Sequence, residues 1–151
     1  MISQKPIALA ADHGGYLLKA AAMKHFDSLG IAYVDYGCNG PESVNYPDYA
    51  KKVCKAIQEE KSDLGILFCG TGIGMSMVAN KHRGIRAACC SDTFSAKLTR
   101  MHNNANILCM GGRVVGEGLA LDMIDLFINT DFEGGRHALR LEMYKDIQGE
   151  K

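Results

Sequence analysis

The sequence has no excess of charge of either sign. Lysine and arginine together number 17, and aspartate and glutamate together also number 17. A surface without an overall charge does not attract nucleic acid or an acidic membrane as a whole. We therefore expect no nucleic-acid partner, and any anion that the protein binds must be held by a local group of residues.

Long hydrophobic runs and paired cysteine motifs are also missing. No stretch approaches the roughly 20 apolar residues of a membrane-spanning helix, and the first residues do not resemble a secretory signal. The six cysteines include no CxxC pair, which is typical of a protein from a reducing compartment. These observations predict a cytoplasmic protein that does not enter a membrane.

The histidines show none of the spacings of known metal sites. There are five of them, and neither HxH nor HExxH occurs. A metal site would have to be assembled wholly from distant positions. We therefore predict that the protein binds no metal.

The length and the pattern of the chain predict one α/β domain over residues 1–151. A chain of this size can bury a core without disulfides or metal. Short apolar runs alternate with helical patterns, which favours a parallel sheet with helices on both faces. The expected strands are 7–11, 31–36, 64–69, 85–90 and 106–110. In the helix 92–101 we expect Phe94, Leu98 and Met101 to face the core, while Leu139, Met143 and Ile147 mark a last helix.

The stretch 64–74, LGILFCGTGIG, is the most informative part of the sequence. Its apolar run suits a strand that is covered on both faces. The glycines that follow Cys69 allow a tight turn that bares its amides where a helix, 73–80, is expected to begin, so that these amides point at a ligand above Cys69. Amides at such a place favour the reactive thiolate form of a cysteine. A glycine-rich turn beside an inert buried cysteine is the alternative reading of this stretch.

Polar residues follow the other expected strands as well. In a parallel sheet the ligand lies outside the carboxyl ends of the strands, so these residues are expected to meet. Asp12 has a helix cap as its alternative role, Thr71 could cap the next helix, and His13 could be an ordinary loop histidine. The residues concerned are Asp12, His13, Gly14 and Gly15 after the first strand, Cys69 and Thr71 after the third, Ser91 and Asp92 after the fourth, and Gly111, Gly112 and Arg113 after the fifth.

Two further groups suggest a bound anion and a proton carrier. Arg136 and Arg140 lie one helical turn apart near the start of the last helix, where like charges repel and the helix dipole disfavours cations. A shared phosphate would reverse that penalty, although a solvated basic face is the alternative. His102 ends the helix 92–101 and is either a histidine favoured by the helix C-terminus or a proton carrier.

These motifs resemble the ribose-5-phosphate isomerase B family, which belongs to a group that includes galactose-6-phosphate isomerase subunits. The resemblance runs nearly end to end. It implies a five-stranded, Rossmann-like α/β/α sandwich, no cofactor, and a dimer or dimer of dimers with active sites between subunits. The motifs are ADHGG at 11–15, NYPDYA at 45–50, CGTGIG at 69–74, ANK at 79–81, GIRA at 84–87, RMHNNAN at 100–106, GGRVVG at 111–116 and EGGRH at 133–137.

The resemblance also implies a role for each site residue in interconverting ribose 5-phosphate and ribulose 5-phosphate. Cys69 would move the proton through an enediolate, and some members carry a glutamate where this chain has Met75. Thr71 would assist Cys69, and His102, helped by Asp12 or Tyr46, would open the sugar ring. The enediolate oxygen would be held by the backbone amides of Gly70, Thr71, Gly72, Ile73 and Gly74. Sugar oxygens would be bound by Asp12 and Asn103, and the phosphate would be bound by His13, Arg113, Arg136 and Arg140.

Three other functions were weighed against this one. A six-carbon aldose phosphate, allose 6-phosphate or galactose 6-phosphate, is the nearest alternative substrate. A dinucleotide-binding protein would use the same glycines with Asp92, but its third fingerprint glycine is replaced by Met75 and the turn follows the wrong strand. A non-catalytic sugar-phosphate binding module would be marked by loss of Cys69 or His102, and both are present.

Overall fold

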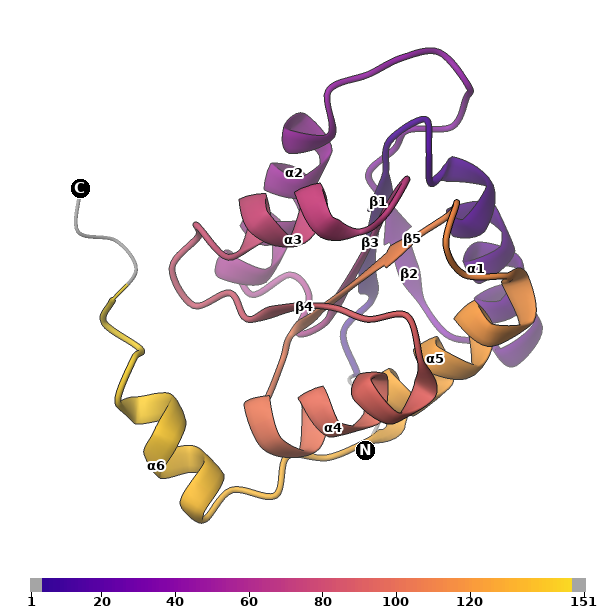
Figure 1. The fold of residues 1–151 in the computed structure, drawn as a ribbon. Helices are drawn as coiled ribbons and strands as arrows, with labels where there is room; N and C mark the ends of the chain where they lie inside the picture. The colour runs from indigo at the N-terminus through magenta and orange to yellow at the C-terminus, as the bar shows by residue number, and fades with distance from the viewer. Residues whose placement is uncertain (1–3, 148–151) are drawn as a thin grey trace.

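The computed structural model describes residues 4–147, which form five strands and six helices in strict βα order up to the last two helices (Figure 1). The elements are β1 (Ile7–Ala11), α1 (Tyr16–Leu29), β2 (Tyr33–Asp35), α2 (Tyr46–Gln58), β3 (Gly65–Cys69), α3 (Ile73–Ala79), β4 (Ala87–Cys89), α4 (Thr93–Asn103), β5 (Ile107–Gly111), α5 (Glu117–Asn129) and α6 (Arg136–Glu142).

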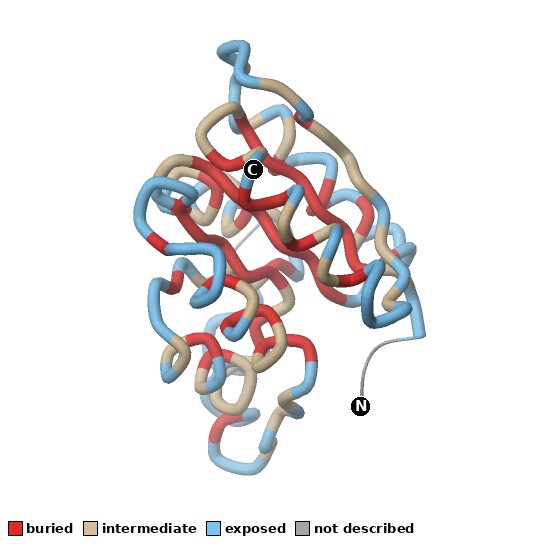
Figure 2. The backbone as a smooth tube through the Cα atoms, turned by 90° about the vertical axis from the view of Figure 1, so that its right-hand side faces the viewer, coloured by how far each residue is buried: buried red, intermediate tan, exposed pale blue. Residues whose placement is uncertain are grey.

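All strands are parallel, in the order β2-β1-β3-β5-β4. The predicted five-stranded α/β/α sandwich is therefore confirmed. Every residue of β1, β3 and β5 is buried, and the sheet forms the buried centre of the tube in Figure 2. One apolar cluster joins one face of the sheet to α1, α4 and α5, and a second joins the other face to α2 and α3.

The connectivity creates a switch point between β1 and β3. From β1 the chain moves outward to β2, whereas from β3 it builds the other half of the sheet with β4 and β5. The crossover connections therefore diverge at the carboxyl ends of β1 and β3, where open α/β sheets bind ligands. The polar residues that follow these two strands lie at this place.

Several helix ends follow their sequence signals. Gly30 ends α1 in the left-handed region, with φ 67°, a conformation that glycine adopts without a steric penalty. Pro47 occupies the first turn of α2, where its missing N–H costs nothing. Asp92 caps α4 by accepting a hydrogen bond from the Ser95 amide over 2.7 Å, and Asn104 closes that helix with φ 45°.

The prediction for the buried face of α4 is wrong. Phe94 is 72% exposed, and the residues that α4 buries are Ala96 and Thr99. Small side chains let this helix lie close against α5, while Leu98 and Met101 are half-buried and Phe94 is left on the outside. The outer strands are also shorter than predicted, because β2 and β4 each span only the residues that pair with a neighbour.

The last helix is short and its apolar residues are not covered. α6 ends at Glu142, and Leu139, Met143 and Ile147 are each at least 70% exposed. In Figure 1, α6 stands beside the C-terminal end of α4 and away from the sheet. None of the helices within residues 4–147 is long and apolar enough to cross a membrane.

Candidate active site

The turns after β1, β3 and β5 are packed together through glycine. A methyl group on Gly14 would lie 2.9 Å from the backbone nitrogen of Gly70, and one on Gly111 would lie 2.6 Å from Cα of Thr71. Real side chains do not tolerate such contacts. The Gly112 amide in turn donates to the Cys69 carbonyl over 2.8 Å. Glycine at these positions therefore allows three strand ends to form one continuous backbone surface.

Cys69 stands at the centre of this surface. It is the last residue of β3, is 5% exposed, and its Sγ accepts a hydrogen bond from the Gly72 amide over 3.0 Å. Gly72 can turn its amide back because its φ is 81°, in the left-handed region. An amide aimed at sulfur stabilises negative charge there. The structure thus gives Cys69 Sγ a backbone hydrogen-bond donor at the strand ends.

The other interior thiols have a different environment. Burial raises the pKa of Cys54 to about 12 and, with the nearby Asp92, that of Cys90 to about 11. Burial also raises the pKa of Cys109 well above its ordinary value. These thiols therefore stay protonated and unreactive at neutral pH.

Asp12 lies next to Cys69 in the structure, on the adjacent strand end. Its backbone amide donates to the carbonyl of Phe68 over 3.1 Å, and its carboxylate accepts from the Gly14 amide over 2.8 Å. Asp12 is 7% exposed. It does not cap α1, whose cap is Gly15 without a side-chain hydrogen bond, so the capping alternative for Asp12 is wrong.

Arg113 and Thr71 complete this part of the surface. The Arg113 amide donates to the Gly70 carbonyl over 3.1 Å, and its guanidinium lies over Gly70, 3.4 Å from where a methyl group would be. The hydroxyl of Thr71 accepts from the Ile73 amide over 3.2 Å at the start of α3. Thr71 precedes the N-cap of α3, which is Gly72 without a side-chain hydrogen bond, so Thr71 is not the cap, and its exposed side chain stands beside the thiol turn.

The loop between β2 and α2 contacts His13 and leads into Tyr46, the first residue of α2. The Val44 amide donates to Nδ1 of His13 over 3.2 Å. A neutral His13 ring therefore carries its proton on Nε2 and can donate it to a ligand. The Tyr46 ring lies against Gly74, where a methyl group would come within 2.8 Å of it. Met75, next to Gly74, is fully buried in the core.

His102 and Asn103 lie at the opposite end of the sheet in the same chain. They end α4, which runs back from the carboxyl end of β4 to the other edge of the sheet. There the Asn106 amide donates to the Arg86 carbonyl over 2.9 Å, and β5 begins at Ile107. Cys69 pairs with Gly111 at the other end of β5. At about 3.3 Å per residue, the length of a strand separates them. One subunit therefore does not bring His102 to Cys69.

His102 has two neighbours from the segment before and inside α6. Its ring is stacked on that of His137, with centroids 4.1 Å apart and planes 12° from parallel. Glu133 Oε2 lies 3.9 Å from Nε2 of His102 and 3.4 Å from Nε2 of His137. Burial and the neighbouring His102 and Arg136 lower the pKa of His137, which keeps that ring neutral. Within residues 4–147 these three side chains are the group that could hold a metal ion, but nearly parallel rings do not converge well on one ion.

Sequence reasoning did not assign roles to Glu133 and His137. Both stand in the EGGRH motif, beside Arg136, and that motif was the only available signal. His137 is 6% exposed and its Nε2 has no hydrogen-bond partner among the described residues. Arg136 and Arg140 are exposed on α6. Because α6 also carries His137, which stacks on His102, the two arginines belong to the group of residues around His102 and not to the group around Cys69.

A cleft of about 630 Å³ lies between α6, the end of α4 and the edge strand β4. Arg86, Asn103, Leu141 and Tyr144 are among its lining residues, and Cys69 is not. The cleft belongs to the same end of the molecule as His102.

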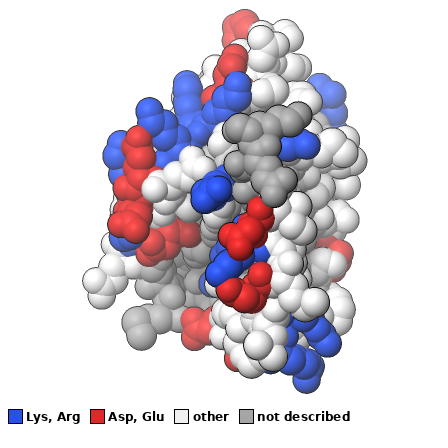
Figure 3. All heavy atoms as spheres, turned by 90° about the vertical axis from the view of Figure 1, so that its left-hand side faces the viewer, with Lys and Arg blue, Asp and Glu red and all other residues white. Residues whose placement is uncertain are grey.

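On the side of the molecule shown in Figure 3, groups of positive and negative side chains lie next to one another, in line with a net charge of zero.

Comparison with known proteins adds to this geometry. Residues 7–144 match the family described as Ribose/Galactose Isomerase. The chain is 43% identical over 144 residues to ribose-5-phosphate isomerase B of Escherichia coli, covering 95% of this chain and 97% of the relative.

Solved structures agree with this chain in fold as well. The structure of Clostridium thermocellum ribose-5-phosphate isomerase B has a TM-score of 0.92 and 46% identity, covering 94% of this chain and 96% of the other. That of the Mycoplasma genitalium enzyme with bound ribulose-5-phosphate has a TM-score of 0.91 and 37% identity, covering 98% and 99%. The chain thus belongs to the ribose/galactose isomerase family and is a sugar-phosphate isomerase.

Proposed function

We propose that this protein interconverts ribose 5-phosphate and ribulose 5-phosphate, with Cys69 as the base. The observation that carries the proposal is the hydrogen bond of 3.0 Å from the Gly72 amide to the nearly buried Sγ of Cys69. It places a backbone N–H donor on a sulfur at the strand ends where a ligand is expected. The carboxylate of Asp12 and the guanidinium of Arg113 lie around the same turn.

The reaction needs a proton moved between two neighbouring carbons. The Cys69 thiolate takes the proton from C2 of the open-chain aldose, the C2–H electron pair forms the C1–C2 double bond of the enediolate, and the carbonyl electron pair moves onto O1. The hydroxyl proton of O2 passes to O1, and the thiol returns its proton to C1, so that C2 becomes the carbonyl of the ketose and Cys69 is a thiolate again. The charge that develops on oxygen is assigned to the amides of residues 70–74 other than Gly72 and Ile73, whose N–H groups already donate to Cys69 Sγ and to the Thr71 hydroxyl. Thr71 assists Cys69, and Asp12 binds the substrate hydroxyls.

The other end of the substrate carries the phosphate. His13 donates from Nε2 because Nδ1 is held by the Val44 amide, and Arg113 adds a positive charge. Arg136 and Arg140 contribute two more guanidinium groups, which suit phosphate oxygens. Binding the non-reacting end turns binding energy into orientation of the reacting carbons.

We infer that His102, Asn103 and the two α6 arginines come from a second copy of this chain. His102 and Asn103 lie about a strand length away from Cys69 within one subunit. The helix that bears the arginines exposes Leu139, and Met143 directly after it is exposed as well. A dimer that buries this helix would place His102 near Asp12 and Tyr46 of the neighbouring copy. His102 would then transfer the proton that opens the furanose ring, and Asn103 would bind sugar oxygens.

A coupled assay tests the reaction. Purified protein is given ribose 5-phosphate, ribulose 5-phosphate and allose 6-phosphate, each with and without a chelator. We expect turnover of both pentose phosphates and no effect of the chelator. Turnover of allose 6-phosphate alone would move the assignment to a six-carbon substrate, and no turnover of any of them would contradict the proposal.

A further inference from the structure

Lys19 is a fully buried lysine outside the residues assigned above. It belongs to α1 and its side chain is 1% exposed. Lysine is almost never buried unless it is paired, and an unpaired ammonium in the interior is costly. Its partners therefore show what this residue is for.

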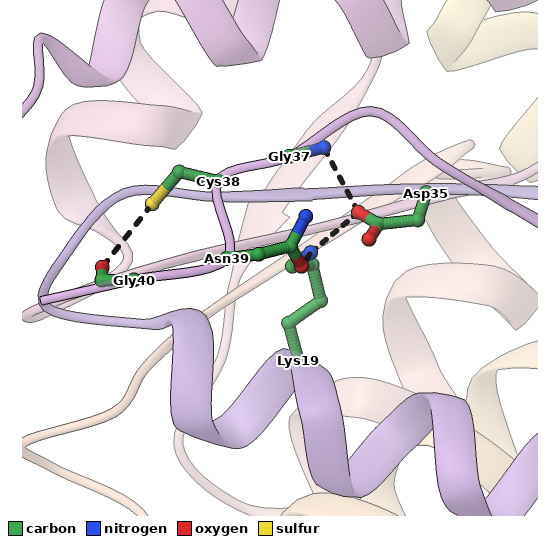
Figure 4. Close-up of polar contacts among 6 residues, drawn as sticks. All are labelled: Lys19, Asp35, Gly37, Cys38, Asn39 and Gly40. Atoms are coloured by element: carbon green, nitrogen blue, oxygen red, sulfur yellow. Dashed lines mark hydrogen bonds and ion pairs between the residues drawn. The ribbon is translucent and has the colours of Figure 1, made fainter.

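The Lys19 ammonium binds two points on the chain that leaves β2 (Figure 4). It forms an ion pair with the Asp35 carboxylate and donates a hydrogen bond to Oδ1 of Asn39 over 2.8 Å. The same Asp35 carboxylate accepts from the Gly37 amide over 2.8 Å. One buried cation thus ties together the end of β2 and the first residues of the loop 37–45.

The electrostatics of Asp35 agree with this arrangement. Burial alone would raise the pKa of the carboxyl, but the hydrogen bonds from Lys19 and from the Gly37 amide outweigh it and lower the pKa. The carboxylate is therefore charged at neutral pH and holds Lys19 in place.

The loop 37–45 contacts the residues of the candidate active site at both of its ends. At its start, the Ala11 amide donates to Gly37 O over 2.7 Å and the Cys38 amide donates to Ala11 O over 2.8 Å, directly before Asp12. At its end, the Val44 amide donates to His13 Nδ1 over 3.2 Å. The helix that follows carries Tyr46 onto Gly74. Movement of this loop would move Asp12, His13 and Tyr46 together.

We propose that Lys19 is a positioning residue of the active site, which acts through Asp35 and Asn39 by holding the loop 37–45 against β1. This inference rests on the proposed function, in which His13 binds phosphate and Asp12 binds sugar hydroxyls. Loss of the anchor would weaken substrate binding more than proton transfer, because Cys69 and its amide donor are held by a different turn.

Asn39 offers the cleanest test because it is exposed and its loss leaves the buried ion pair intact. Asn39→Ala removes the acceptor, Asn39→Asp keeps an oxygen at the same place, and Ser43→Ala in the same loop is the control. We expect Asn39→Ala to raise KM for ribose 5-phosphate about three- to tenfold, less than the full loss of a hydrogen bond to a charged group, because Asp35 still pairs with Lys19, with kcat changed much less. Asn39→Asp should restore KM.

The ion pair itself is tested by removing both charges. Lys19→Met combined with Asp35→Leu leaves no uncompensated buried charge, so the variant is expected to fold. Its KM should rise at least as much as that of Asn39→Ala. Wild-type KM values in this variant and in Asn39→Ala, or equal effects of Asn39→Ala and Asn39→Asp, would overturn the proposal.

Hydrogen exchange separates this inference from the proposed function. In the free protein, amides of residues 37–45 should exchange faster in Asn39→Ala than in wild type or Ser43→Ala, whether or not ribose 5-phosphate is a substrate. Faster exchange with no turnover in wild type would contradict the function alone. Unchanged exchange would contradict the anchoring role of this network.

Discussion

The Gly72 amide and the Cys69 sulfur are joined by a hydrogen bond of 3.0 Å at the end of the central strand. The bond exists because Gly72 adopts a left-handed conformation that directs its N–H back toward the strand. A side chain at position 72 would be strained and would also meet the backbone of Met110 at 2.9 Å. The chemistry that we assign to Cys69 therefore depends on a backbone turn that only glycine accommodates.

The arginines of α6 provide the first prediction. Arg136→Ala and Arg140→Ala should each raise KM for ribose 5-phosphate about tenfold or more, because loss of a charged hydrogen bond costs about 1.5 to 3 kcal/mol. Both side chains are exposed in the subunit and would face the phosphate site in the dimer, so the melting temperature without substrate should hardly change. Steady-state kinetics and thermal denaturation are measured together. A wild-type KM in both variants would remove these residues from the phosphate site.

The direction of the reaction isolates the role of His102. The variant His102→Asn should lose activity on ribose 5-phosphate, whose ring must be opened, and keep much of it on ribulose 5-phosphate, which is already open-chain. Rates in the two directions are compared at saturating substrate. Equal losses would mean that His102 acts elsewhere, for example in holding the stacked His137 ring.

Mixing two inactive variants tests whether subunits share a site. Cys69→Ala and His102→Asn are unfolded and refolded together, and activity on ribose 5-phosphate is compared with each variant refolded alone. A heterodimer would contain one site with both residues intact, so random pairing should recover about a quarter of wild-type activity. If the mixture stays as inactive as its components, Cys69 of one subunit and His102 of the other do not form a common active site, and the shared-site proposal is contradicted.

The sequence predicted much of the fold because its signals are local. The strands of β1, β3 and β5 are continuous apolar runs, and Gly30, Pro47 and Asp92 mark helix ends by their backbone chemistry. The face of α4 was predicted wrongly, since large apolar residues such as Phe94 usually point inward. Here the close packing of α4 on the core is made by Ala96 and Thr99.

The site was predictable only in part, for a physical reason. Residues at strand ends can be collected from the order of elements, so Asp12, Cys69 and Arg113 were expected to meet. The stacking of His102 on His137 joins two segments that no local pattern connects. The pairing of Lys19 with Asp35 is likewise invisible in the sequence, because a lysine on a helix normally faces solvent.

Alkylation should distinguish Cys69 from the interior thiols. Iodoacetamide is expected to inactivate the enzyme by modifying Cys69, and substrate should protect it. Cys54 and Cys90 should react slowly because burial raises their pKa values to about 12 and about 11. The modified position is identified by mass spectrometry of peptides. Inactivation that tracks modification of exposed Cys89 and spares Cys69 would contradict this assignment.

The most direct test of the account is the turnover number of Cys69→Ala. Because Met75 is buried and its thioether does not accept a proton usefully, we expect Cys69 to carry the whole proton transfer, and general-base catalysis typically contributes about 10² to 10⁴-fold. We predict a folded protein, checked by circular dichroism and melting temperature, whose kcat with ribulose 5-phosphate falls by at least about a hundredfold. A folded Cys69→Ala variant that keeps more than about a tenth of wild-type kcat would contradict the account.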